Sequence, residues 1–297
     1  MGAGSSGAVL AARLSEDRTR SVLLLEAGPD FATIEETPPD LLDGKNISVV
    51  DHDWNFTAEA FPGRTIAYPR GKATGGSSAV NATVALRGVP ADYDEWAAQG
   101  NRAWAWENVL TYFRRLEDDQ DEGGDLHGKD GPIYVRRWRN EELHPFSLGV
   151  AGAFKRLGYP GVSDHNHPES TGYGPYPVNQ NAGLRVSTAI GYLLPARHRL
   201  NLTIRPHCLV SRVLFEGDRA VGVEVESGNE TQVVRGRRIT LSGGAVASPA
   251  ILLRSGVGPK ADLTALGIPP IADLPGVGAN LLDHPTASLM LLPKPGV

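Results

Sequence analysis

The chain has 297 residues, of which 41% are hydrophobic and 21% are charged, proportions that are ordinary for a soluble globular protein with a large core. Its formal net charge is −5 and it has no basic run, which argues against nucleic acid as the main partner, because duplex binding needs clustered positive charge. No apolar run approaches the ~18 residues of a membrane span, so we expect no membrane-spanning segment.

A glycine-rich turn opens the chain, and its glycines have the spacing Gly2-x-Gly4-x-x-Gly7. The small apolar residues of 8–17 predict a helix directly after the turn. The run SVLLL at 21–25 then predicts a buried strand, because a Gly-Pro pair soon ends it.

This order of turn, helix and strand has two interpretations. In the first, the turn and the helix N-terminus bind a pyrophosphate, and Glu26 at the end of the strand binds ribose hydroxyls. In the second, the glycines only cap a helix and Glu26 lies on the surface. The context favours the first interpretation, although such a turn normally follows a strand and only Met1 precedes it here.

A second glycine-rich loop spans residues 70–81, after an irregular stretch at 30–69. Gly75 and Gly76 carry no Cβ, so their backbone can approach a phosphate or a flat ring closely. A flexible surface loop of the same composition is the alternative. If both glycine segments bind one ligand, the ligand is long, as a dinucleotide with a reactive ring is, and this points to a flavin.

The middle of the chain predicts two helices, over 107–117 and 145–158, because apolar residues recur there at helical spacing. We expect the acidic stretch 117–131 to be a solvated linker rather than a calcium site, since it lacks alternating ligands. Residues 159–183 predict a long loop. His165 and His167 lie in it beside an aspartate, but no third ligand stands at a motif spacing, so we predict no metal site.

The stretch 201–241 predicts an antiparallel meander followed by an apolar strand at 238–241. A helix is expected over 248–254. Cys208, the single cysteine, excludes an intrachain disulfide, fits a buried position, and favours a reducing compartment. We also recognise no signal peptide, and together with the single cysteine this favours a cytoplasmic location. Secretion stays open, because the strand that normally precedes such a glycine turn is expected to be missing from this chain.

Four segments in this order resemble the glucose–methanol–choline (GMC) oxidoreductase family of flavoproteins. They are MGAGSSGAVLAARLSED with VLLLEAG, PRGKATGGSSAVNATVALRG with DYDEWA and WAWENVLTYFRRLED, GAVASPAILLRSGVGP, and LPGVGANLLDHP.

The resemblance implies an α/β fold, a Rossmann-like FAD-binding domain with an inserted antiparallel meander, plus part of a substrate domain. The FAD-binding parts would be 1–144, without its initial strand, and 201–285. The substrate domain would contribute 145–200 and would begin again, truncated, at 286–297.

The resemblance also implies a role for individual residues. Glycines of the first turn would line the pyrophosphate, Glu26 would bind the adenosine ribose, and the second loop would lie along the pyrophosphate and the flavin. The first signature region contains no histidine, so we predict non-covalent FAD. The implied cofactor-binding residues are Gly2, Gly4, Gly7, Glu26, Arg70, Gly75, Gly76, Ser77, Asn81, Val210 through its backbone, Ala245, Asp283 and His284.

The reaction that the resemblance implies is oxidation of a small alcohol to an aldehyde or ketone, with hydride transfer to the flavin and proton transfer to a base. In the family that base lies near the C-terminus, which corresponds to a point beyond Val297, so we predict no catalytic residue in this chain. A non-catalytic flavin-binding remnant and a member of the family's lyase branch remain alternatives. An NAD-dependent dehydrogenase is disfavoured, because one Rossmann turn does not explain the loop at 70–81.

Overall fold

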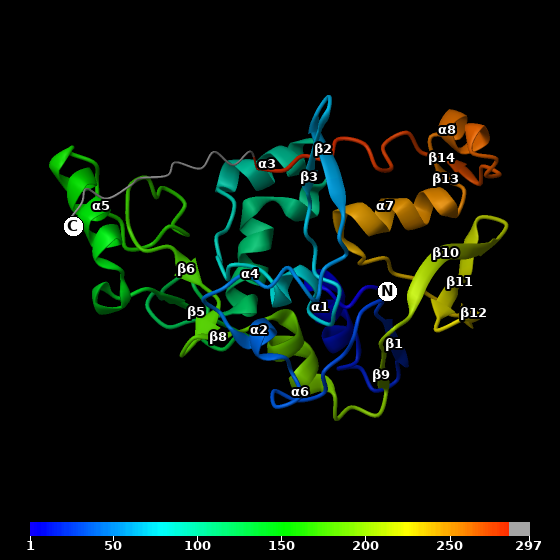
Figure 1. Ribbon diagram of the computed structural model, residues 1–297, viewed down its shortest axis with the longest axis horizontal. Coiled ribbons are helices and arrows are strands. Elements are labelled where there is room, and N and C mark those ends of the chain that lie inside the picture. Colours follow the sequence, from blue (N-terminus) through cyan, green and yellow to red (C-terminus); the bar gives the residue numbers. More distant parts are fainter. Residues whose placement is uncertain (285–297) are drawn as a thin grey trace.

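The computed structural model describes residues 1–284 and has the predicted α/β architecture, with parallel strand pairs, several helices and an antiparallel meander (Figure 1). The predicted start of a further substrate-domain segment at 286–297 lies outside the described residues. No helix within residues 1–284 is long and apolar enough to cross a membrane. The helices are α1 (Ser5–Leu14), α2 (Pro39–Leu42), α3 (Pro90–Ala98), α4 (Trp106–Leu116), α5 (Pro145–Arg156), α6 (Leu194–Ala196), α7 (Gly244–Arg254) and α8 (Lys260–Ala265).

The strands form small sheets. Parallel pairs join β1 (Val22–Leu25) to β9 (Leu202–Arg205) and β13 (Val257–Gly258) to β14 (Ala272–Asp273). The hairpins are β2 (Thr57–Phe61) with β3 (Arg64–Ala67), and β7 (Gln180–Asn181) with β8 (Leu184–Arg185). Two three-stranded sheets are formed by β4 (Glu117–Asp119), β5 (Ile133–Arg137) and β6 (Pro177–Val178), and by β10 (Leu209–Glu216), β11 (Arg219–Ser227) and β12 (Glu230–Arg235).

Met1 and Gly2 enter the glycine turn between two extended segments. The Gly2 N–H donates to the carbonyl of Leu25 at the end of β1, at 2.8 Å, and the Ser242 N–H donates to the Met1 carbonyl at 2.8 Å. The prediction of a strand at 238–241 is wrong, because the structure has no strand there. Residue 242 nevertheless forms a backbone hydrogen bond with the start of the chain. The turn is therefore fixed from both sides.

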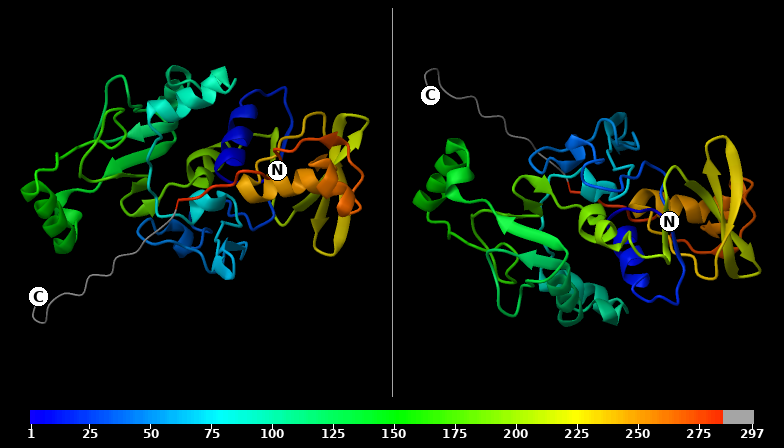
Figure 2. Two further views of the ribbon diagram at one scale, coloured as in Figure 1. Left: turned by 90° about the horizontal axis from the view of Figure 1, so that it is seen from above. Right: turned by 90° about the horizontal axis from the view of Figure 1, so that it is seen from below.

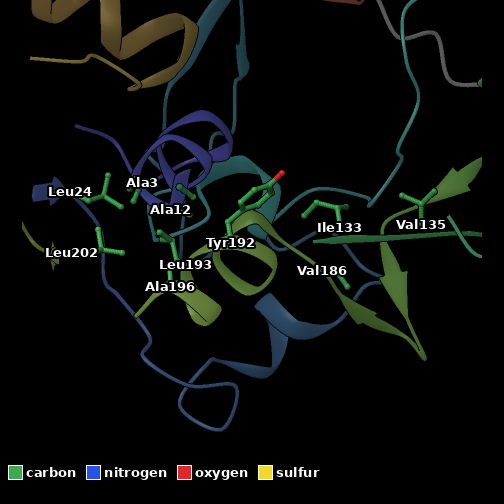
Figure 3. Packing of buried hydrophobic residues seen from close by; sticks show 12 residues of the cluster. Ala3, Ala12, Leu24, Ile133, Val135, Val186, Tyr192, Leu193, Ala196 and Leu202 are labelled. Atoms are coloured by element: carbon green, nitrogen blue, oxygen red, sulfur yellow. The ribbon is translucent and has the colours of Figure 1, made fainter. Parts of the chain in front are cut away.

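The largest core cluster packs α1 onto β1, β9 and the helical turn η4 (Ala189–Leu193), as Figure 3 shows. Ala8, Ala11 and Ala12 face inward from α1, and their small side chains let the helix approach the sheet closely. Leu193 and Leu24 complete the contact. This packing holds the N-terminus of α1 at a defined position beside β1.

The meander β10–β12 and α7 form a second cluster around Val210, Val223, Val225 and Ile251 (Figure 1). The predicted meander is confirmed. The helix predicted over 248–254 begins earlier, at Gly244, and includes Pro249 in its second turn. A proline there lacks the N–H that would bond one carbonyl of the first turn, which the helix tolerates near its end.

The acidic stretch after α4 was wrongly predicted to be a solvated linker. Glu117 and Asp119 belong to strand β4 and are 4% and 0% exposed. The hairpin β2–β3 was also missed, and it stands out from the body of the molecule (Figure 1). Helix α5, close to its predicted range, lies at the end of the molecule opposite the meander in all views (Figures 1 and 2).

Candidate functional site

A cavity of about 570 Å³ lies where the glycine turn, the loop at 70–81, the meander and α7 meet. Eight of the predicted site residues line it: Gly2, Gly4, Glu26, Arg70, Gly76, Ser77, Val210 and Ala245. Its volume is in the range of small-molecule and cofactor sites. Segments that are far apart in the sequence, from Met1 to Arg254, therefore build one concave site.

The two glycine segments touch each other. The Gly75 N–H donates to the Ala3 carbonyl at 2.8 Å, and a Cβ on Gly76 would lie 2.6 Å from the Cα of Gly4. Gly76 also has a φ of +51°, which side chains rarely adopt. Only glycine permits this contact, and the two segments lie side by side in the wall of one cavity.

The loop at 70–81 is packed rather than flexible surface. Ala73, Ala79 and Val80 are buried and form a cluster with Leu41. A short helical turn, η1 (Gly76–Ala79), begins at the second of the two left-handed glycines, Gly75 and Gly76. The backbone on the cavity side is thereby held against a small core of its own.

Two helix N-termini open into the cavity. The first residues of α1 and the first residues of α7 both line it, and neither helix has an acidic residue in its first turn. The unpaired N–H groups and the helix dipoles give such ends a partial positive charge. The cavity is thus suited to an anionic group such as a pyrophosphate.

Glu26 lies at the end of β1 and is 5% exposed. Its carboxylate accepts the Ala3 N–H at 2.7 Å and the Gly28 N–H at 2.9 Å. Burial raises the pKa of Glu26, and the backbone donors oppose that shift. Each carboxylate oxygen keeps a second lone pair, so the side chain fixes the glycine turn and can still accept a hydroxyl.

Five predicted residues lie outside the cavity wall. Gly7 packs beneath the turn, where a Cβ would be 1.7 Å from the Gly2 carbonyl oxygen. Gly75 and Asn81, in the second loop, do not line the cavity. Asp283 pairs with Arg70 at 2.9 Å and is followed by exposed His284. The pair ties the last described segment to the entrance of the loop at 70–81.

A family model for GMC oxidoreductases matches residues 1–286. The chain belongs to the GMC oxidoreductase family. It is 40% identical over 296 residues to human mitochondrial choline dehydrogenase, covering 96% of this chain and 49% of that protein. It is also 40% identical over 292 residues to a GMC-type oxidoreductase of Rhodococcus erythropolis, covering 97% and 58%.

Solved GMC structures agree with the fold. Pyridoxine 4-oxidase from Mesorbium loti superposes with a TM-score of 0.86 at 36% identity, over 92% of this chain and 54% of that chain. An FAD-dependent oxidoreductase from Chaetomium thermophilum gives a TM-score of 0.85 at 33% identity, over 93% and 50%. The GMC chain spans about half the length of the curated relatives it matches.

The remaining cavity wall contains residues that no sequence pattern predicts. Trp54 and Phe56 stack with ring centroids 5.5 Å apart, and both line the cavity. Lys72 lies over the Trp54 ring at 4.9 Å. Cys208, correctly predicted to be buried, also faces the cavity. The Trp-x-Phe pair lies in the stretch 30–69, whose sequence has no helical or strand periodicity that would mark these two residues.

Away from the cavity, the GMC chain contains a buried ionic cluster. Asp119 accepts Arg137 Nη1 at 2.6 and 2.7 Å, Asp164 accepts Arg137 Nη2 at 2.7 Å, and Arg87 donates to Glu117. His127 contacts all three carboxylates, at 3.0 Å to Glu117 and 3.1 Å to each aspartate. The three carboxylates balance the two guanidinium groups only if His127 carries a proton.

The charge balance agrees with the directions in which the cluster shifts the pKa values of its members. Burial alone would lower the pKa of His127, but hydrogen bonds to Asp119, Asp164 and Glu117 raise it to about 10. Burial would raise the pKa of Asp119, and bonds from His127 and Arg137 hold it well below its usual range. Glu117, Asp119 and His127 have ligand atoms within 4.8 Å of one another, as in a metal site. Because guanidinium groups already bond both carboxylates, we interpret the group as an ion network.

Proposed function

We propose that this chain is the FAD-binding half of an oxidoreductase that acts on the CH–OH group of a small alcohol. One observation carries the proposal, namely the contact between the two glycine segments at Gly4 and Gly76, at the edge of a single cavity. A ligand in this cavity must tolerate close backbone approach from both loops, and the cavity volume of about 570 Å³ is in the range of cofactor sites. FAD meets both requirements.

We propose the following roles. Gly2 and Gly4, at the start of α1, would hold the pyrophosphate, and Glu26 would accept a ribose hydroxyl. Val210 would contact the adenine through its backbone. The residues proposed to lie along the pyrophosphate and flavin are Arg70, Gly75, Gly76, Ser77 and Asn81, with Ala245, Asp283 and His284 near the cofactor.

When bound, FAD supplies the hydride acceptor. The residues of this chain would orient it, exclude water with Trp54 and Phe56, and offset the pyrophosphate charge with two helix N-termini. None of the eight histidines of the chain lines the cavity. We therefore propose that the base that removes the hydroxyl proton comes from a different part of the whole protein.

We also propose that the cofactor is bound non-covalently. The stretch from Arg70 to Glu117 contains no histidine that could form a bond to the flavin ring. Acid precipitation of the flavin-loaded protein should release all the flavin into the supernatant. Flavin that stays with the precipitate would contradict this part of the proposal.

The test is to purify the chain with added FAD and to record the visible flavin absorption. Choline, pyridoxine and an aryl alcohol are then added without oxygen, since the relatives' names supply these probes. We expect bound flavin that these alcohols do not bleach. Rapid bleaching would contradict the proposal that the catalytic base lies outside this chain. Failure to bind FAD would overturn the proposal that the chain is an FAD-binding half. Cleavage of a cyanohydrin without bleaching would favour the lyase alternative.

A further inference from the structure

Arg185, in β8, is fully buried, and within residues 1–284 its guanidinium makes no ion pair with a carboxylate. Its guanidinium donates instead to backbone carbonyls. Nε donates to Leu41 at 3.2 Å, Nη2 donates to Asp43 at 2.6 Å and to Asn46 at 2.5 Å, and Nη1 donates to Asn81. One side chain therefore joins the segment around α2 to the end of the loop at 70–81.

A buried charge without a counter-ion is costly unless every donor finds an acceptor. Burial lowers the pKa of Arg185, and Asp43 and Asp40 oppose this only through space. The guanidinium carries its donors on three separate nitrogens and reaches four carbonyls here, whereas a lysine ammonium has only three donors, all on one nitrogen. The site is therefore built for arginine.

The residues that follow Arg185 contact the same loop. The Thr188 N–H donates to Ser78 Oγ at 3.0 Å, and the two hydroxyl oxygens are 3.0 Å apart. Ser78 Oγ in turn donates to the Gly75 carbonyl at 2.6 Å. A Cβ on Gly75 would lie 3.2 Å from the Cβ of Ala189, at the start of the π-helical turn η4.

Residues 185–189 thus lie against one side of the loop, while its other side, at Gly71, Gly76 and Ser77, lines the cavity. Two successive glycines give the loop more conformational freedom than other residues would. A binding loop that is ordered in only part of the molecules binds its ligand more weakly in proportion to that fraction.

We propose that Arg185, assisted by Thr188, is a positioning residue that holds the loop at 70–81 in its cofactor-binding conformation. The role rests on the proposed FAD site but concerns the order of the loop before the ligand binds. The side chain does not touch the cavity and acts through the carbonyl of Asn81.

Hydrogen exchange of the full chain without FAD tests this directly. In Arg185→Lys, the amides of residues 75–83 should exchange at least tenfold faster than in the wild type, whereas those of 117–137 should not change. The FAD dissociation constant should rise about tenfold, as expected if about a tenth of the molecules keep the loop ordered. Thr188→Val should show the same pattern with a smaller increase, and it tests the proposal if Arg185→Lys does not fold.

Arg137→Gln is the matched control, because Arg137 is a similarly buried arginine bonded to carboxylates away from the cavity. It should lower stability without changing the FAD dissociation constant or exchange at 75–83. Guanidinium ion added to Arg185→Gly should restore FAD binding, whereas ethylammonium should not. Normal loop exchange and FAD affinity in the Arg185 and Thr188 variants would overturn the inference. A wild type that does not bind FAD would instead overturn the proposed function, and the exchange data would still test the loop.

Discussion

At the residue scale, the site depends on positions where no Cβ can be accommodated. Gly4 and Gly76 are 72 positions apart in sequence, yet their backbones are in contact. The glycine-rich composition predicted that each loop could approach a ligand closely. It did not predict that the loops approach each other, because no local pattern encodes a contact at that separation.

Gly76→Ala should therefore separate the loops. The added Cβ combines left-handed backbone strain with overpacking, so we expect a loss of roughly 2–4 kcal/mol in the free energy of unfolding and at least about tenfold weaker FAD binding. Urea denaturation and FAD titration measure both. Gly228→Ala is the control, since its φ is +61° and nothing lies within 4 Å of its Cβ position. It should lose only about 1 kcal/mol and keep its FAD affinity.

Glu26→Gln tests the carboxylate that joins β1 to the glycine turn. An amide offers one acceptor oxygen, so one of the two backbone N–H donors, from Ala3 or Gly28, would face an NH₂ group. We expect a loss of roughly 1–3 kcal/mol in stability and weaker FAD binding, by the same two titrations. Glu226→Gln changes an exposed carboxylate that also lines the cavity, and it should leave stability unchanged. Equal effects of both variants would show that charge, and not the turn, is what Glu26 contributes.

At the element scale, periodicity predicted α1, α4, α5 and the meander, because each buries an apolar stripe or face. It failed at β4, whose sequence Glu117-Asp118-Asp119 has the composition of a surface loop. The cations that permit its burial, His127 and Arg137, come 8 and 18 residues after Asp119. A sequence pattern within one segment cannot show that its charges are neutralised by residues of another segment.

The His127 cluster should make stability depend on alkaline pH. The folded-state pKa of about 10 exceeds the ordinary 6.5, so the stabilisation is fully present below pH 6.5 and is lost as pH rises through 10. The groups that face the imidazole are Glu117, Asp119 and Asp164, with Arg87 and Arg137 bonded to them. Urea unfolding between pH 6 and pH 10.5 should show a loss of roughly 2–4 kcal/mol.

His127→Gln should reduce that pH dependence and lower stability at neutral pH, because the carboxylates lose a cation. His198→Gln, at an exposed position, should retain the wild-type profile. A wild-type profile in His127→Gln would contradict the assignment of the charge to this imidazole.

At the scale of the whole molecule, the order of the family segments predicted the α/β fold and the composition of one cavity wall. The sequence did not reveal Trp54 or Phe56, because they lie in an irregular segment before β2 where no periodicity marks them. It did not reveal Arg185 because that side chain bonds backbone carbonyls, which carry no residue signature. FAD at 100 times its dissociation constant should stabilise the chain by about 2.7 kcal/mol, which thermal denaturation can detect.

The central claim is that the turn at residues 2–7 and the loop at 70–81 hold one ligand. Hydrogen exchange of the wild-type chain with and without FAD tests it most directly. We predict that FAD protects the amides of residues 2–7 and of 75–78 together, at the same FAD concentration. Protection of only one segment, or protection of the two at different concentrations, would contradict the claim that they form a single site.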